Sequence, residues 1–185
     1  MLSFETERLR MRPWQLSDLN EFFQLEQNPH VGPAAGWRPV SNLEESRKIL
    51  QSFCKQSDEL CAITLKDSGR AIGSLGLHPD EKRDATLQSV TRMLGYVLDE
   101  PFWGLGYMTE AAQGALRFAF DQMNLELVSV YHFPFNNRSR RVIEKCGFHY
   151  EGTLRRAFLR YDGAILDDML YSITRDEFYT IYGIA

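Results

Sequence analysis

Two glycines near the middle of the chain have the spacing and the setting of an anion site. Gly104 and Gly106 follow an apolar, β-rich run at 93–98, and helical periodicity begins directly after them. Glycine lets a backbone approach an anion closely, and the first amides of a helix have no carbonyl partner inside it. This strand, turn and helix start therefore predict a pyrophosphate site, although glycine pairs also form ordinary tight turns.

The same spacing excludes two common nucleotide sites. The chain has no G-x-x-x-x-G-K-[ST] motif, so a P-loop is not expected. The third glycine of a Rossmann fingerprint is missing, the motif comes late in the chain, and the next strand carries no acidic residue at its end. What remains is a cofactor that has a pyrophosphate and a reactive arm lying beside a strand.

A second polar group stands at another predicted strand-to-helix junction. Asn136, with Ser139 three residues later, precedes a helical stretch at 138–146 that ends at Gly147. From such a junction an Asn amide and a Ser hydroxyl can reach a ligand, but Asn is also a favoured helix N-cap. Both interpretations of this N-x-x-S stay open at this point.

The elements that must position these residues follow the order β-α-α-β-β-β-α-β-α-β-β. Alternation and β-branched content predict strands, whereas apolar residues at helical spacing predict helices. The strands are expected at 7–12, 60–66, 71–77, 87–98, 125–133, 148–160 and 164–173, and the helices at 18–26, 43–55, from the glycines to about 123, at 138–146 and at 176–181. Residues 28–40, rich in Pro and Gly, are expected to be a loop. This order predicts an α+β domain with a mixed, mostly antiparallel sheet.

Composition narrows the class of protein. The chain has 185 residues, 44% of them apolar, which predicts a single folded domain over 1–185. Its net charge of −4 comes from acids and bases mixed along the sequence, so no nucleic-acid partner is expected. The first residues carry charges too early for a signal peptide and no apolar run is long enough to span a membrane, so a cytoplasmic protein with no membrane partner is expected. The three cysteines lack metal-ligand spacing, so reduced thiols and no metal are expected.

Four segments together resemble the GNAT superfamily of acetyl-CoA-dependent N-acetyltransferases, and within it the RimJ/RimL-like branch of ribosomal-protein N-terminal acetyltransferases. They are 6–13 (TERLRMRP), 94–98 (LGYVL), 103–111 (WGLGYMTEA) and 136–148 (NNRSRRVIEKCGF). The resemblance covers nearly the whole chain. It implies the GNAT fold, a mixed sheet of about seven strands with helices on both faces and a splay between the fourth and fifth strands.

The resemblance also implies how acetyl-CoA is held as co-substrate, without a metal. Backbone groups of the strand at 94–98 would hold the pantetheine arm, the glycine turn would hold the pyrophosphate, and Asn136 and Ser139 would contact CoA near its thiol end. The implied cofactor residues are Leu94, Tyr96, Val97, Leu98, Trp103, Gly104, Leu105, Gly106, Tyr107, Met108, Asn136 and Ser139.

Three positions depart from the pattern of the family. Pro101 stands where many relatives have a Gln or Arg donor, Met93 where they often have a Glu base, and Ile143 where many have a Tyr acid. Ser139 remains the matched candidate for the acid that protonates the leaving thiolate. No motif gives the base. His132 at the end of its strand is the first candidate, because an unperturbed imidazole titrates near neutral pH, and His78 at the end of another strand is a weaker one. A structural His132 is the competing interpretation.

The acceptor is expected to be a primary amine, either a protein N-terminus or a small molecule. Relatives build the acceptor pocket in the region that here carries His30, Trp37 and Arg38, and Asp167 matches an acidic position of the branch. Trp37 as a core side chain and Asp167 as a solvated strand acid are the alternatives. A catalytically silent CoA-binding module is the competing function, motivated by Met93 and Ile143. A monomer and a homodimer are both compatible with the sequence.

Overall fold

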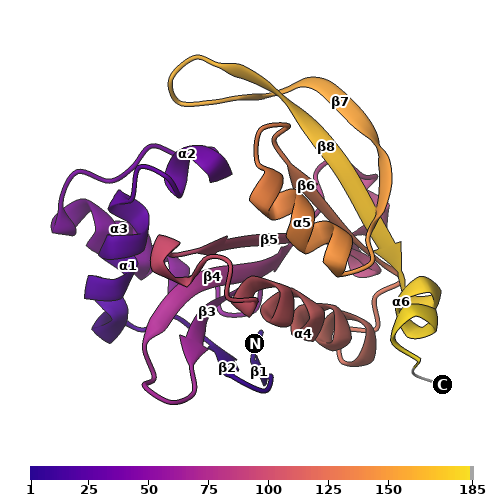
Figure 1. Ribbon diagram of the computed structural model, residues 1–185, viewed down its shortest axis with the longest axis horizontal. Coiled ribbons are helices and arrows are strands. Elements are labelled where there is room, and N and C mark those ends of the chain that lie inside the picture. The colour runs from indigo at the N-terminus through magenta and orange to yellow at the C-terminus, as the bar shows by residue number, and fades with distance from the viewer. Residues whose placement is uncertain (184–185) are drawn as a thin grey trace. The chain divides into compact units, whose positions relative to one another are not determined.

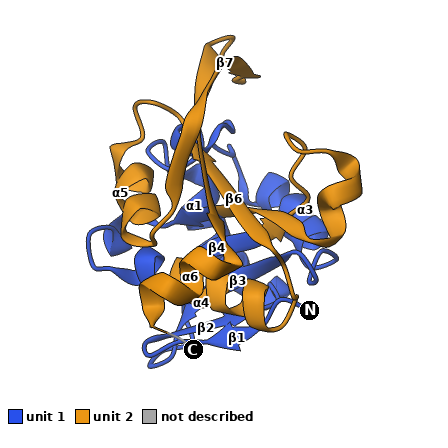
Figure 2. Cartoon of the chain, turned by 90° about the vertical axis from the view of Figure 1, so that its right-hand side faces the viewer, with its two compact units in different colours: residues 1–76, 96–111 blue, residues 77–95, 112–185 orange. Residues whose placement is uncertain are grey.

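The computed structural model describes residues 1–183 and divides into two compact units (Figure 2). Unit 1 comprises Met1–Gly76 and Tyr96–Ala111, and unit 2 comprises Leu77–Gly95 and the chain from Ala112 onward. Three elements pass from one unit into the other, namely β4 (Ala71–His78), β5 (Thr91–Leu98) and α4 (Tyr107–Asp121). That residues 1–185 form a single domain stays a prediction.

Unit 1 is a sheet with helices. Its strands follow the order β1-β2-β3-β4-β5, and β1 to β4 pair antiparallel. Besides parts of β4, β5 and α4, it holds β1 (Phe4–Glu5), β2 (Leu9–Arg12), β3 (Leu60–Leu65), the short helices η1 (Leu16–Asp18) and η3 (Glu100–Phe102), and the helices α1 (Leu19–Gln27), α2 (Gly32–Ala35) and α3 (Leu43–Phe53).

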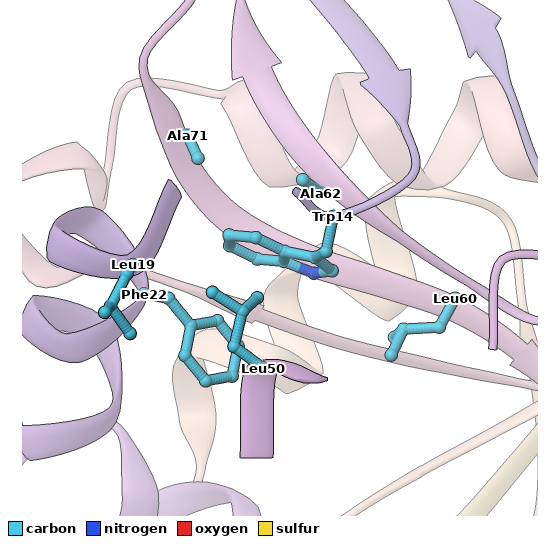
Figure 3. Close-up of a cluster of buried hydrophobic side chains, with 7 residues drawn as sticks. All are labelled: Trp14, Leu19, Phe22, Leu50, Leu60, Ala62 and Ala71. Atoms are coloured by element: carbon cyan, nitrogen blue, oxygen red, sulfur yellow. The ribbon is translucent and has the colours of Figure 1, made fainter. Parts of the chain in front are cut away.

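An aromatic cluster forms a core of unit 1. The Trp14 and Phe22 rings meet edge to face with their centroids 4.9 Å apart, and Leu50 of α3 packs beside them (Figure 3). The Trp14 indole N–H donates to Ser74 Oγ at 3.2 Å, so its polar atom is satisfied inside the core. The helical spacing of Leu19 and Phe22 turns one face of α1 toward the sheet.

Unit 2 holds a mixed sheet in which β5, β6, β8 and β7 are neighbours in that order. Its further elements are η2 (Ala85–Ser89), β6 (Leu127–His132), β7 (His149–Leu159), β8 (Ile165–Thr174), α5 (Asn137–Lys145) and α6 (Arg175–Tyr182). Strands β7 and β8 form a long antiparallel hairpin (Figure 1), and β8 also pairs antiparallel with β6. Among residues 1–183 the strands number eight, and β1 is the one added to the predicted set. The predicted α+β class and mixed sheet are confirmed.

The parallel pair formed by β5 and β6 separates early. The pairing joins Thr91–Met93 to Leu127–Ser129, and Leu94 and Gly95 of unit 2 lie beyond it. Strand β6 nevertheless continues in register with β8 as far as His132, which lies opposite Met169. Backbone groups of β6 on the β5 side therefore leave the ladder after Ser129, which is how a splay between these two strands begins.

Glu26 gives unit 1 a pH-dependent stability that the sequence does not reveal. Its side chain lies on α1 at 5% exposure, and burial, together with the charge of Glu45, raises its pKa from 4.5 to about 7. Because the unfolded chain releases this proton near 4.5, the free energy of unfolding should fall by about 3 kcal/mol as pH rises from about 4.5 to about 7.

We therefore expect Glu26→Gln to stabilise the protein above neutral pH. The gain over the wild type should be small near about pH 5 and about 2–3 kcal/mol near about pH 8, measured by urea unfolding. Glu44→Gln, on the exposed side of α3, is the matched control and should give no such pH-dependent gain. Equal gains at the two pH values would show that Glu26 is ionised in the folded protein.

Candidate active site

The glycine turn joins β5 to α4 inside unit 1, and its backbone needs glycine. Gly104 and Gly106 have φ of 78° and 82°, in the left-handed region that side chains disfavour. Trp103 fixes the start of the turn because its indole N–H donates to the Leu98 carbonyl at 2.7 Å. A Cβ at Gly104 would meet nothing within 4 Å, so the outer side of the turn is open.

The turn presents backbone donors of the kind an anion needs. The first intrahelical bond of α4 runs from the Glu110 N–H to the Gly106 carbonyl at 3.0 Å, so the amides of Tyr107 and Met108 precede it. Gly104, Leu105 and Gly106 are exposed. Pro101 lies in η3 and has no N–H to donate. The turn therefore fits a pyrophosphate bound by backbone amides at a helix start.

One side chain from the bend between β1 and β2 contacts this turn, and its function is not evident from the sequence. The Arg8 guanidinium donates to the Leu105 carbonyl at 3.1 Å and to Glu110 Oε2 at 2.6 Å, and it lies over the Tyr107 ring at 4.4 Å. Thr6 Oγ1 donates to the other oxygen of Glu110 at 2.6 Å. The motif at 6–13 therefore meets the motif at 103–111 in unit 1.

The expected acceptor region also contacts the segment that precedes the glycine turn. His30 Nδ1 lies 2.8 Å from Glu100 Oε2, and the Asn28 amide donates to the same oxygen at 3.1 Å. Glu100 opens η3, which leads directly into Trp103 and the glycines. Within unit 1, Asn28 and His30 therefore connect the region 28–40 by hydrogen bonds to the segment that starts the glycine turn.

Residues 28–40 are not the plain loop that the Pro and Gly content predicts. They contain α2, whose first turn carries Pro33 and which ends at Gly36 with φ of 103°. Pro is well suited to a helix start and Gly to its end, so the same residues that break longer helices bound this short one. The Trp37 indole packs on Gly32, and its N–H is buried with no hydrogen-bond partner in residues 1–183. Arg38 pairs with Glu45 at 2.7 Å.

His132 lies at the end of β6 in unit 2, with one ring nitrogen engaged. Nδ1 lies 2.8 Å from the Phe133 carbonyl, so in the neutral ring Nδ1 carries the proton and Nε2 accepts. The side chain is buried, and Nε2 has no hydrogen-bond partner among residues 1–183. The ring lies 5.5 Å from that of Tyr171, measured between centroids. The lone pair of Nε2 is therefore not engaged by any described protein group.

Asn136 and Ser139 begin α5, as the sequence indicates. The Asn136 side chain accepts from the Ser139 N–H at 3.1 Å, so Asn136 is the N-cap of this helix. Ile143, one turn further on, is 1% exposed and belongs to the core of unit 2. Ile143, at the position where many relatives have a Tyr acid, is therefore a core side chain here.

Asp167 lies on β8 and stabilises an irregular point of the hairpin. Its Oδ1 accepts from the Arg156 N–H at 2.7 Å, and Arg156 has a left-handed φ of 54°. The register between β7 and β8 shifts in the same stretch, between Leu154 and Phe158. Asp167 is thus bonded to the backbone of the neighbouring strand rather than simply solvated.

A buried carboxylate next to β4 is a second feature that the sequence does not indicate. Asp80, 1% exposed, accepts from Ser129 Oγ at 2.5 Å and from Tyr131 Oη at 2.7 Å. Burial opposes its ionisation, but these two hydrogen bonds, a third from the Lys82 N–H and the nearby Arg83 guanidinium together outweigh burial and lower the pKa of Asp80. Ser129 and Tyr131 alternate with His132 along β6, so Asp80 braces the sheet face opposite His132.

Metal-binding clusters and membrane-spanning helices are both absent from residues 1–183. No group of three or more His, Cys, Asp and Glu side chains is placed there to hold a metal ion. No helix in that range is long and apolar enough to cross a membrane.

Comparison with known proteins identifies the family. Residues 8–149 match the acetyltransferase (GNAT) domain. The chain is 25% identical over 182 residues to the uncharacterized N-acetyltransferase p20 of Bacillus licheniformis, covering 96% of this chain and 99% of that protein. It is 26% identical over 191 residues to the [ribosomal protein uS5]-alanine N-acetyltransferase of Escherichia coli, covering 93% and 90%.

The solved structures agree with this assignment. The crystal structure of an acetyltransferase from T. thermophilus superposes with a TM-score of 0.81 at 27% identity, covering 98% of this chain and 93% of that one. GNAT enzymes transfer an acetyl group from acetyl-CoA to an amine. With a glycine turn that fits a pyrophosphate and a match over residues 8–149, the chain belongs to the GNAT family of acetyl-CoA-dependent N-acetyltransferases.

Proposed function

We propose that this enzyme acetylates a primary amine by direct attack of that amine on the thioester of acetyl-CoA. The observation that carries the proposal is the glycine turn, where two left-handed glycines lead into the first amides of α4. The three cysteines are not placed by any motif to carry an acetyl group, and Cys61 and Cys146 are buried with pKa raised by burial to about 12. A covalent acetyl-cysteine step is therefore not part of the proposal.

The proposed cofactor contacts divide by unit. In unit 1, backbone groups of Tyr96–Leu98 bind the pantetheine arm and backbone amides of Trp103–Met108 bind the pyrophosphate. In unit 2, the Leu94 backbone binds the arm, and Asn136 and Ser139 contact CoA near its sulfur. Leu94 lies just beyond the β5–β6 pairing, which supports a backbone group available to a ligand.

In the proposed reaction one covalent bond forms, one breaks, and two side chains move the protons. The neutral amine attacks the thioester carbonyl, the new C–N bond forms, and the C–S bond breaks. His132 Nε2 takes the proton that the amine loses, directly or through a water molecule. Ser139 gives its hydroxyl proton to the departing thiolate and regains one from solvent, while His132 releases to solvent the proton it took from the amine. The Nε2 atom without a protein partner in residues 1–183 supports the first assignment, and the position of Ser139 in the first turn of α5 supports the second.

The acceptor is proposed to be a protein N-terminus or a small primary amine, contacted by His30, Trp37, Arg38 and Asp167. The relative in Escherichia coli, whose name gives an alanine of ribosomal protein uS5 as acceptor, favours an N-terminus and the RimJ/RimL-like branch. The hydrogen bonds that join Asn28 and His30 to Glu100 support a coupling between this region and the glycine turn.

Ser139→Ala is expected to lower kcat by about tenfold or more, because the thiolate would leave without its proton donor. Affinity for acetyl-CoA should fall less than kcat, because the variant loses one side-chain contact to CoA but keeps the Ser139 backbone N–H that forms the helix cap. Steady-state kinetics with a thiol reagent measure both quantities. An unchanged kcat would show that Ser139 does not protonate the thiolate and only forms part of the first turn of α5.

A catalytically silent CoA-binding module is the second candidate. The burial of Ile143 favours it, because this side chain supplies no acid where many relatives have Tyr. The experiment that separates the two is an acceptor screen with acetyl-CoA that reads free thiol. Peptides with Ala or Ser N-termini, a polyamine and an aminoglycoside are the probes. Turnover with one of them supports the enzyme, whereas tight acetyl-CoA binding with no turnover on the whole panel supports the silent module.

A further inference from the structure

We propose that Arg8 is the positioning residue of the glycine turn. Its guanidinium fixes the backbone between Gly104 and Tyr107 and balances the charge of Glu110, so that the start of α4 accepts a pyrophosphate. The inference rests on the proposed function, in which this turn binds the pyrophosphate of acetyl-CoA. It assigns to the segment before β2 a function in cofactor affinity beyond its part in the sheet.

The geometry that supports this is a single side chain that lies against three successive residues of the turn, Leu105, Gly106 and Tyr107. Arg8 Nη1 donates to the carbonyl of Leu105, the residue between the two glycines, at 3.1 Å. The guanidinium lies on the ring of Tyr107, the first residue of α4. A Cβ at Gly106 would lie 3.4 Å from Arg8 Nη2, so the guanidinium packs directly against the second glycine. A planar group with several fixed donors makes these contacts together, which a flexible Lys ammonium does not.

The electrostatics of the helix start give the second reason. Glu110 lies in the first turn of α4, the same turn whose amides are proposed to meet an anion. Burial of Glu110 opposes its ionisation, but hydrogen bonds from Thr6 and Arg8 outweigh burial and lower its pKa. The carboxylate therefore stays charged, and it would repel a pyrophosphate unless a cation stands beside it. Arg8 Nε, 2.6 Å from Glu110 Oε2, supplies that cation.

Arg8→Met is the variant that tests the inference, because it keeps an aliphatic side chain of similar length and removes the guanidinium with its N–H donors and its charge. We expect the Kd for acetyl-CoA, measured by calorimetry, to rise about tenfold, since charge-assisted hydrogen bonds are lost at the turn. At saturating acetyl-CoA, kcat and the KM for the acceptor amine should stay at the wild-type values. A residue that served only the fold would instead lower the active fraction, and with it kcat, at unchanged Kd.

Arg10→Met is the matched control. Arg10 lies two residues further along and pairs with Glu5 at the surface, so its loss should leave the Kd unchanged. The double variant Arg8→Met with Glu110→Gln should recover part of the lost affinity, because the unpaired carboxylate is removed as well. A Kd for Arg8→Met within twofold of the wild type, or equal losses for Arg8→Met and Arg10→Met, would overturn the inference.

Failure of the inference and failure of the proposed function give different results. If Gly106→Trp leaves acetyl-CoA binding intact, the turn is not the pyrophosphate site, and the proposed cofactor contacts fail with it. If Gly106→Trp abolishes binding but Arg8→Met has no effect, the turn binds the cofactor and only the function given to Arg8 is wrong. Thermal unfolding of each variant shows whether the protein remains folded.

Discussion

Gly106→Trp is expected to abolish acetyl-CoA binding, with a Kd at least about 100-fold higher than in the wild type. Gly106 is exposed, has φ of 82° and lies one residue before α4. An indole there would occupy the space in front of the first amides of the helix and would push on the Arg8 guanidinium. The lost backbone contacts to a charged group are worth about 1.5–3 kcal/mol each, so two of them account for the expected change.

The control for this variant must carry the same backbone strain without touching the turn. Gly69→Trp meets that need, because Gly69 lies in unit 1 between β3 and β4 with φ of 70° and a Cβ there would meet nothing within 4 Å. Both variants should lose similar thermal stability, and only Gly106→Trp should lose acetyl-CoA binding. Wild-type affinity in a folded Gly106→Trp protein would contradict the assignment of the glycine turn.

His132→Asn has the second largest expected effect, a fall in kcat of about 100-fold or more with little change in the Kd for acetyl-CoA. The Asn amide can still donate to the Phe133 carbonyl in place of Nδ1, so the local structure should persist. What is lost is the basic nitrogen at Nε2, which is buried and has no partner within residues 1–183. The amine would then have to give its proton to water.

His149→Asn is the comparison for this effect, because His149 is an exposed imidazole on β7 and is not proposed to react. We expect its kcat to equal that of the wild type. If His132→Asn keeps kcat within about threefold of the wild type, His132 is a structural residue of β6, and the proton must leave by another route.

The sequence predicts the parts of this protein that depend on local patterning. Gly104 and Gly106 sit where a strand meets a helix, and their left-handed φ values follow from that position. Helix capping also depends on local sequence, and the structure shows Asn136 as the N-cap of α5. The mixed sheet follows from the order of strands and helices, which the sequence reveals through alternation and helical spacing.

The features that escape sequence reasoning depend on contacts between distant segments. Arg8 meets Glu110 across more than a hundred positions, and nothing in the TERL segment alone says which acid it will pair with. Asp80 lies in a stretch that looks like a polar turn, yet it is buried against Ser129 and Tyr131. The helix α2 escapes prediction because Pro33 and Gly36 break long helices while they also bound short ones.

The most direct test of acetyl transfer is the release of CoA thiol when the purified protein meets acetyl-CoA and a peptide that begins with Ala, with an N-terminally blocked copy of the same peptide and a small polyamine run beside it. We expect one amine substrate to release thiol in equal amount to the acetylated amine found by mass spectrometry, and Gly106→Trp to release none. Thiol released without an acetylated amine, or no release on any amine by a protein that binds acetyl-CoA tightly, would contradict this expectation.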